Sequence, residues 1–296
     1  MHAFDRLVQA CQSTGSAVCA GLDLHLSELP PRLRSDGLAG CRTFLWAVLD
    51  ALQGQVPVVK PQIAFFEQLG PPGIELYFDC IRESHRRGFL VIGDIKRGDI
   101  GSTAAAYAAA HLAPNDGSAA DFVTLNPYMG FDGIEPFLET GRRTGRGVFV
   151  LARTSNPSAG ELQDLSTGDV PLYLHVGRRI GEWGRLNLGV RGFGDAGAVV
   201  GATHPRELEV MRRGLKDVFF LVPGYGAQGG SAKDVTAAFT GENVGAVVNS
   251  SRSLLFAYKT AEGGERRFAE CAREAARKMT LDLRSAWRAR PSGVDL

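Results

Sequence analysis

Charged residues of both signs directly follow an apolar run in the stretch GFLVIGDIKRGDIGST, which spans residues 88–103. Asp94, Lys96 and Asp99 form the pattern D-x-K-x-x-D within it. On an extended strand, Asp94 and Lys96 lie two residues apart and therefore project to the same side. An ammonium group held between carboxylates keeps its charge. The pattern predicts that Lys96 is a proton donor rather than a nucleophile.

Lys60 ends a second apolar run, VPVVK, at residues 56–60. If the two runs are neighbouring strands, Lys60, Asp94, Lys96 and Asp99 form an array of alternating charge that fixes each ammonium group in place. A carboxylate fixed beside a substrate carboxylate raises the energy of that group, which is one route to ejecting it as CO₂. The alternative is a structural network of ion pairs at the rim of a sheet.

A second group of residues is typical of a phosphate site. The segment PGYGAQGG at 223–230 is rich in glycine, and NSSR follows another apolar run at 249–252. Glycines let the backbone approach a phosphate closely, and Arg252 would add a bidentate contact. The alternative is that the glycines only form turns and that Arg252 is a surface cation.

The elements that must position these residues alternate between strands and helices. Nearly continuous apolar runs predict parallel strands at 16–23, 56–60, 89–96, 121–127, 147–154, 196–203, 218–224 and 244–251. Helical patterns lie between or after them, at 41–53, 71–87, 102–112, 132–143, 171–187, 204–214, 232–240 and 262–288. Repeated β-then-α units of this number predict a TIM (β/α)₈ barrel. An open doubly wound sheet is the alternative, but the first turn lacks its glycine-rich signature.

Three segments lie outside this repeat. We expect residues 1–15 to form an extra N-terminal helix that closes the bottom of the barrel, and residues 155–170 to form a long polar loop after the fifth strand. A long loop at the catalytic end is often a lid. Residues 289–296 are predicted to be a frayed tail, and the whole chain, 1–296, is predicted to be a single domain.

The ends of the predicted strands carry polar groups or glycine turns. In a TIM barrel these ends meet at one face, where the site forms. Read in chain order they are Asp23, Lys60, Asp94 with Lys96, Asn126, 153–155, Thr203, 223–224 and 250–252. A single Asp after a strand is usually a turn residue or a helix cap, but the joint pattern predicts a functional mouth.

Composition excludes several classes of function. Net charge is +1 and gives no support to nucleic-acid binding. The five cysteines lack metal or disulfide spacing, and neither a membrane span nor a signal peptide is evident, so we expect a cytoplasmic protein with reduced thiols. The histidines make no metal spacing, and Lys60 and Lys96 would repel Mg²⁺ from nearby aspartates, so we expect no metal.

Taken together, these motifs resemble those of the orotidine 5′-phosphate decarboxylase family, in its longer bacterial branch. The resemblance spans roughly residues 16–256 and rests on eight motifs in order: GLD, KPQIAFFE, DIKRGDIGST, TLNPYMG, LARTSNPS, VVGATHP, VPGYGAQGG and NSSR. The chain departs from the shorter branch between the charges of the third motif and by its greater length at 155–195 and in the tail.

The resemblance implies cofactor-free and metal-free conversion of orotidine 5′-phosphate to UMP and CO₂ in de novo pyrimidine biosynthesis. Lys96 would protonate C6 beside Asp94, with Lys60 and Asp99 completing the array. The resemblance implies that Asp23 and Thr103 contact the ribose and that Ser155 contacts the pyrimidine. The implied phosphate contacts are Gly224, Gln228, Ser251 and Arg252. Two further implied substrate-binding residues are Asn126 and Pro223. Family members are homodimers, so Asp99 and Thr103 would reach the neighbouring site.

Two other functions stay open. A metal-dependent sugar-phosphate relative on the same barrel, such as a hexulose-phosphate synthase or ketogulonate-phosphate decarboxylase, would carry an acidic ligand where Lys60 stands. A non-catalytic protein that binds a phosphorylated ligand would retain the fold without turnover.

Overall fold

A closed barrel of parallel strands forms the centre of the molecule. The computed structural model describes residues 1–226 and 229–290. Neighbouring strands follow the order β1-β10-β9-β8-β5-β4-β3-β2, and β2 pairs with β1 to close the ring. The strands are β1 (Val18–Leu22), β2 (Val58–Pro61), β3 (Leu90–Arg97), β4 (Phe122–Leu125), β5 (Gly147–Arg153), β8 (Ala196–Val200), β9 (Phe220–Val222) and β10 (Ala246–Ser250). The predicted TIM barrel is confirmed, and the open sheet is excluded.

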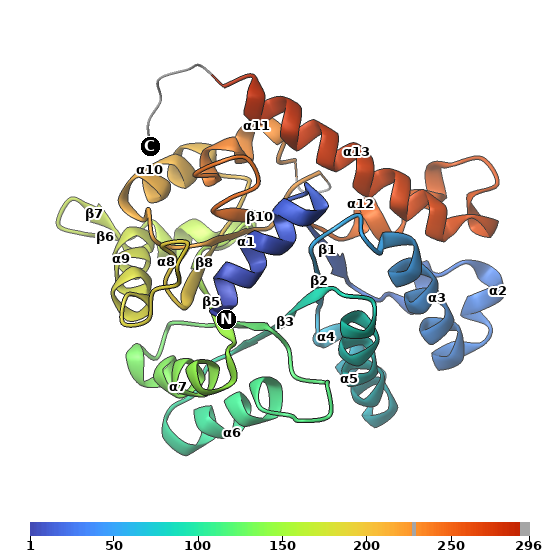
Figure 1. The fold of residues 1–296 in the computed structure, drawn as a ribbon, viewed down its shortest axis with the longest axis horizontal. Coiled ribbons are helices and arrows are strands. Elements are labelled where there is room, and N and C mark those ends of the chain that lie inside the picture. The colour runs from blue at the N-terminus through green and yellow to red at the C-terminus, as the bar shows by residue number, and fades with distance from the viewer. Residues whose placement is uncertain (227–228, 291–296) are drawn as a thin grey trace.

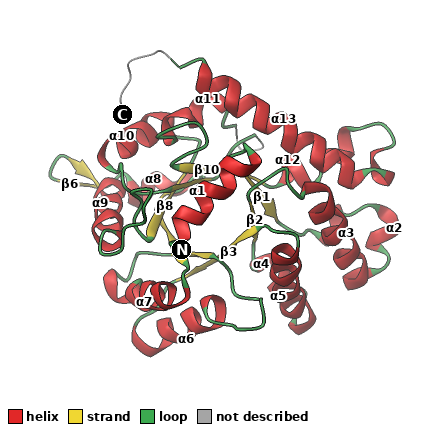
Figure 2. Ribbon diagram, viewed as in Figure 1, coloured by secondary structure: helices red, strands yellow, loops and turns green. Residues whose placement is uncertain are grey.

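Helices surround the strands, as Figures 1 and 2 show. They are α1 (Ala3–Thr14), α2 (Pro31–Arg34), α3 (Gly37–Leu52), α4 (Ala64–Glu67), α5 (Pro71–Arg86), α6 (Gly101–Leu112), α7 (Glu135–Thr144), α8 (Gly160–Gln163), α9 (Leu172–Gly184), α10 (Pro205–Gly214), α11 (Ala232–Val235), α12 (Arg252–Leu255) and α13 (Phe268–Arg288). The four-residue helices α2, α4, α8 and α12 were not predicted, because one turn is too short to show a helical period. No helix in the described ranges is long and apolar enough to cross a bilayer.

Helix α1 lies across the N-terminal end of the barrel, in the centre of the view in Figure 1. Its apolar residues follow helical spacing, so that Phe4, Leu7, Val8 and Cys11 share one buried face. The Phe4 ring lies 4.9, 5.3 and 5.4 Å from the rings of Phe122, Phe149 and Phe219 at their centroids. The same core includes Val199 and Leu221, which also line the cavity at the other end. The helix therefore forms the base on which the site is built.

The segment after β5, residues 155–170, is folded rather than a plain loop. It contains a 3₁₀ turn at Pro157–Ala159, helix α8 and the short strand β6 (Ser166–Thr167), which pairs with β7 (Val170–Pro171). Gln163 of α8 accepts a hydrogen bond from the Thr154 amide at 2.9 Å and donates one to the Thr154 hydroxyl at 2.7 Å. Arg153 at the end of β5 pairs with Asp164 at 3.2 Å. These contacts attach the segment to the rim of the barrel.

The C-terminal helix α13 packs against α3 and α12 on the outside of the barrel. Its Thr280 hydroxyl shares a 2.8 Å hydrogen bond with Ser16, which precedes β1. Of the predicted frayed tail, residues 291–296 lie outside the described residues.

Replacing Phe4 with alanine tests the role of α1. Because the side chain is fully buried among three aromatic rings, we expect Phe4→Ala to lower the free energy of unfolding by about 3–5 kcal/mol. The measurement is urea denaturation, with Leu281→Ala on α13 as the exposed control, which should change stability by less than about 0.5 kcal/mol. Equal effects of the two substitutions would contradict the packing described here.

Candidate active site

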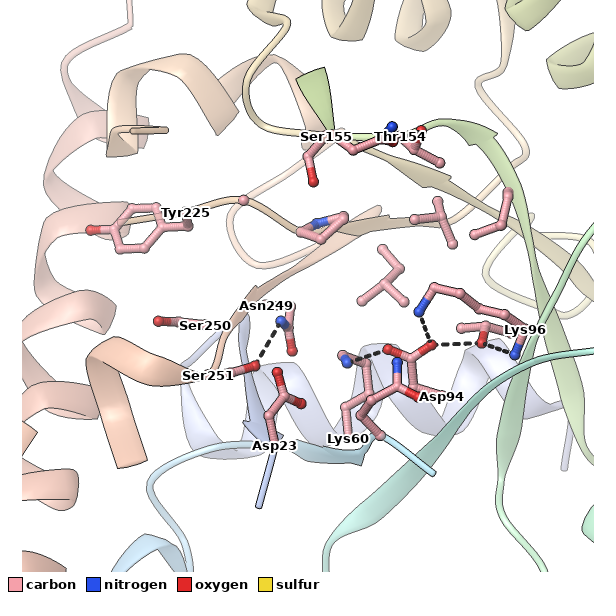
Figure 3. A pocket seen from close by; sticks show the side chains of 18 of the residues that line it. Asp23, Lys60, Asp94, Lys96, Thr154, Ser155, Tyr225, Asn249, Ser250 and Ser251 are labelled. Carbon is pink, nitrogen blue, oxygen red and sulfur yellow. Dashed lines mark hydrogen bonds and ion pairs between the residues drawn. The ribbon is translucent and has the colours of Figure 1, made fainter. Parts of the chain in front are cut away.

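A cavity of about 450 Å³ opens at the carboxyl ends of the barrel strands. This volume suits a small organic ligand. The predicted site residues that line it are Asp23, Lys60, Asp94, Lys96, Ser155, Pro223, Gly224, Ser251 and Arg252. Figure 3 shows Ser155 on the opposite side of the cavity from Asp23, Lys60 and Asp94. The barrel thus brings together residues that are more than two hundred positions apart in the sequence.

Asp94 lies between two lysines. Its Oδ2 is 2.5 Å from Lys60 Nζ and its Oδ1 is 2.5 Å from Lys96 Nζ, as Figure 3 shows. Asp94 and Lys60 are each only 5% exposed, whereas nearly half of the Lys96 side chain remains accessible from the cavity side of the array. One carboxylate therefore orients two ammonium groups, and the more accessible of them is Lys96.

Burial and charge act in opposite directions on this array. Burial alone would raise the pKa of Asp94, but the charges and hydrogen bonds of Lys60 and Lys96 hold it well below its usual range. Burial alone would lower the pKa of Lys60, but the nearby Asp94 and Asp23 carboxylates hold it above its ordinary value. Both groups therefore stay charged through the neutral range of pH.

The backbone at Lys96 departs from the regular strand that the sequence analysis assumed. Its φ is +46°, in the left-handed region, and the β3–β4 register shifts between Gly93 and Arg97. The amide of Lys96 donates to the Thr124 hydroxyl at 3.0 Å, and that hydroxyl donates to Asp94 Oδ1 at 2.8 Å. The two side chains meet as the spacing predicted, but the strand is bulged where they do.

Asp23 and Asn249 both line the cavity. The Oδ1 atoms of both are buried and have no hydrogen-bond partner among the described residues. Asn249 Nδ2 donates to the Ser251 hydroxyl at 3.4 Å. Sequence reasoning missed Asn249 as a site residue, although a polar side chain two positions before Ser251 on an apolar strand is the signal that could have found it.

The loops after β9 and β10 form the side of the cavity predicted to bind phosphate. Gly224 and Gly226 have φ values of +100° and +74°, which glycine adopts without strain. The Gly230 amide donates to the Gly224 carbonyl at 3.1 Å, so the loop folds back on itself. Ser251, which follows β10, and Arg252, the first residue of α12, also line the cavity. Gln228, predicted to contact the phosphate, lies outside the described residues.

Three predicted residues lie outside the cavity lining found in the described part of the chain. Asp99 is half-buried and accepts a hydrogen bond from the Ile100 amide at 2.8 Å, and Thr103 is exposed at the start of α6. Asn126 is exposed and accepts a hydrogen bond from the Tyr128 amide at 3.0 Å. Their roles in the site stay predictions.

Among residues 1–226 and 229–290, no group of three or more His, Cys, Asp or Glu side chains is arranged to hold a metal ion. The two oxygens of Asp94 are each bound to a lysine instead.

Comparison with known proteins identifies the lineage of this site. Residues 16–266 match the model of the orotidine 5′-phosphate decarboxylase / HUMPS family. The chain belongs to this family. Orotidine 5′-phosphate decarboxylases of Rhodopirellula baltica and Clostridium kluyveri are 46% and 42% identical to it. The first alignment covers 87% of this chain and 89% of the relative, and the second covers 94% and 96%.

Solved structures of the family share the fold over almost the whole chain. A Streptomyces avermitilis crystal structure is 34% identical with a TM-score of 0.81, over 97% of this chain and 96% of that one. The OMP decarboxylase of Leishmania donovani is 31% identical with a TM-score of 0.76, over 98% of this chain and 100% of that one. The predicted membership of the orotidine 5′-phosphate decarboxylase family is confirmed.

Replacing Asp94 with asparagine should destabilise the protein by an amount that depends on pH. We expect Asp94→Asn to lower the free energy of unfolding by about 3–5 kcal/mol near pH 7, because Lys60 stays buried without its partner. Burial then lowers the folded-state pKa of Lys60 below its unfolded value of about 10.4, so the unfolded state binds more protons at alkaline pH. The stability gap, meaning the difference in free energy of unfolding between the wild type and Asp94→Asn, should therefore narrow as pH rises from about 7 to 10.

Urea denaturation at several pH values measures this gap. Asp132→Asn, which removes an exposed carboxylate, is the control and should show a small gap that does not change with pH. In the wild type, the Lys60 contribution is complete below its unfolded pKa and the Asp94 contribution is complete above about pH 4. A gap for Asp94→Asn that stays constant with pH would contradict the electrostatic account.

Proposed function

We propose that this protein decarboxylates orotidine 5′-phosphate to UMP and CO₂, a step of de novo pyrimidine biosynthesis. The observation that carries the proposal is the Lys60–Asp94–Lys96 array at the mouth of the barrel, in a chain 42–46% identical to orotidine 5′-phosphate decarboxylases over most of its length. The array supplies a fixed proton donor beside a fixed carboxylate. These are the groups that a decarboxylation without an electron-accepting cofactor requires.

In the proposed mechanism, the bond between C6 and the carboxylate carbon breaks and CO₂ departs. The electron pair remains on C6, where the Lys96 ammonium stabilises it and then donates a proton. Lys96 is left neutral and regains its proton from water. Two observations support this role: the Lys96 side chain is nearly half accessible, and its Nζ is held 2.5 Å from Asp94, which orients the ammonium group without taking its proton.

Asp94 would also act on the substrate before the bond breaks. Both of its oxygens already accept hydrogen bonds from lysines, and its depressed pKa keeps it charged. A substrate carboxylate placed beside it would be destabilised relative to the less charged transition state. Lys60 compensates the Asp94 charge from the buried side.

Substrate recognition is divided around the cavity. We assign the ribose to Asp23, because its Oδ1 has no hydrogen-bond partner among the described residues and suits a hydroxyl donor. The pyrimidine amide is assigned to Ser155 on the opposite side of the cavity. The phosphate is assigned to Arg252, Ser251 and the backbone of the 223–230 loop, with Gln228 included from the family motif. Binding energy gathered at the remote phosphate can then be expressed in the transition state.

Residues 155–170 are the proposed lid. Ser155 and Asn156, at the start of the segment, line the cavity, and Gln163 and Asp164 attach the rest of it to Thr154 and Arg153, which supports this role. A lid at this position would exclude water once substrate is bound.

The proposed active unit is a homodimer. Asp99, Thr103 and Asn126 lie near a surface that exposes Ile100, Tyr128 and Met129, and the outer face of α6 exposes small alanines. An apolar surface of this kind suits burial against a second copy. Asp99 and Thr103 would then complete the neighbouring site. We also propose a cytoplasmic protein, in keeping with five cysteines that are all free and buried.

A metal-dependent sugar-phosphate enzyme is the second candidate, because such relatives on the same barrel also carry the D-x-K-x-x-D pattern of the third strand. Lys60, paired with Asp94, argues against it, since an ammonium group stands where a metal ligand would be needed. A non-catalytic binding protein would have no use for the buried array.

The test is the loss of orotidine 5′-phosphate absorbance on addition of purified protein, with and without EDTA. We expect turnover that EDTA leaves unchanged, because the groups proposed for catalysis are side chains. No turnover with retained UMP binding would favour a binding protein. Turnover of a sugar phosphate that EDTA abolishes would favour the metal-dependent relative.

Mixing two inactive variants tests the shared site. Lys96→Ala should bind UMP without turnover, and Asp99→Ala should also be inactive. In an equal mixture, half of the randomly formed dimers carry one site with both residues intact, so roughly a quarter of wild-type activity should return.

The matched control mixes Lys96→Ala with Lys60→Ala. Both substitutions remove residues that each chain contributes to its own cavity, so the mixed dimer has no intact site and should stay inactive. Recovery in both mixtures, or in neither, would contradict the assignment of Asp99 to the partner's site.

A further inference from the structure

Thr124 is a buried polar residue in a strand that is otherwise apolar. It is the third residue of β4, FVTL, and is 1% exposed. Its side chain contributes to the cavity lining next to the ion array. A hydroxyl is costly to bury unless it forms hydrogen bonds, so its partners indicate why it is there.

The single Thr124 hydroxyl links two parts of the array. The Lys96 amide donates to it at 3.0 Å, and it donates to Asp94 Oδ1 at 2.8 Å. The direction of both bonds is fixed, because a backbone amide can only donate and an ionised carboxylate can only accept. The hydroxyl therefore uses its donor and its acceptor at the same time, on the proposed proton donor and on the carboxylate that orients it.

The β3–β4 register explains why a side chain is needed at this point. Gly93 pairs with Val123 and Arg97 pairs with Leu125, so three residues of β3 lie opposite the single residue Thr124 of β4. The bulge removes the backbone partner that a regular ladder would offer to the Lys96 amide. The Thr124 hydroxyl takes its place, and Lys96 is held at φ +46°, a conformation that residues other than glycine rarely adopt.

We infer that Thr124 is a positioning residue for the proton donor: its hydroxyl holds the Lys96 backbone in the bulge and, at the same time, fixes the rotation of the Asp94 carboxylate. The inference rests on the proposed decarboxylase function. With the hydroxyl in place, Asp94 Oδ1 is turned to Lys96 and Oδ2 to Lys60. Without it, the carboxylate loses one of its bonds and the Lys96 amide loses its acceptor, so the ammonium group is no longer directed at one point.

Comparison of Thr124→Val with Thr124→Ser tests the inference. Valine keeps the shape of threonine but removes the hydroxyl, whereas serine keeps the hydroxyl. We expect Thr124→Val to lower kcat about 10- to 100-fold, the effect of losing a hydrogen bond to a charged group. KM should stay within about threefold, because the phosphate and pyrimidine contacts are elsewhere. Thr124→Ser should retain most of the wild-type kcat.

Thr140→Val is the matched control, since Thr140 is also buried but lies on α7 and is not among the described residues that line the cavity. It should leave kcat unchanged. A wild-type kcat in Thr124→Val, or equal loss in Thr124→Val and Thr124→Ser, would overturn the inference, because the hydroxyl would then not be the group that matters.

Crystal structures of the two Thr124 variants give a readout that does not need activity. In Thr124→Val, Lys96 should leave the left-handed region and its Nζ should move away from Asp94 Oδ1, while Thr124→Ser should keep both. An unchanged Lys96 in Thr124→Val would overturn the inference. If the wild type does not decarboxylate orotidine 5′-phosphate, the proposed function fails, and these structures still decide whether Thr124 positions Lys96.

Discussion

The buried Asp94 carboxylate, shared between two ammonium groups, is the interaction on which the rest of the site depends. Without a partner, a carboxylate buried this deeply would tend to take up a proton and become neutral. With only one lysine, the carboxylate would be paired but could not orient a second ammonium group. With one oxygen bound to Lys60 and the other to Lys96, the array has a buried end and an accessible end. That asymmetry suits the role proposed for Lys96, the more accessible of the two lysines, as the proton donor.

The barrel contributes rigidity to this arrangement. Lys60 and Asp94 come from the adjacent strands β2 and β3, whose backbones are fixed by the ladder, while Thr124 comes from β4 on the other side. Three consecutive strands therefore define the positions of three charges. Ser155, Gly224 and Arg252, to which substrate recognition is assigned in the proposal, line other parts of the same cavity.

The chain order of strands and polar strand ends was enough to predict the barrel and most of the cavity lining, because parallel apolar runs and their carboxyl ends leave a local signature. The backbone conformation of Lys96 could not be predicted from such a local signature. Its left-handed φ depends on a hydroxyl 28 positions away, and Thr124 within TLNPYMG has the appearance of an ordinary strand residue. The place of Asp99 is harder still, since the prediction assigns it to a site on another chain. Asn249 was missed because it stands next to serines that a phosphate site already accounted for.

The closed base of the barrel also limits how ligands enter and leave the cavity. Phe4 and its aromatic neighbours fill the N-terminal end, and Val199 and Leu221 join that core directly to the floor of the cavity. A nucleotide that enters the cavity at the carboxyl ends of the strands must therefore leave through the same opening. Because substrate and product would occupy the same cavity, a new substrate molecule can bind only after the previous product has left through that opening, and the packing of α1 against the base of the barrel offers no second exit.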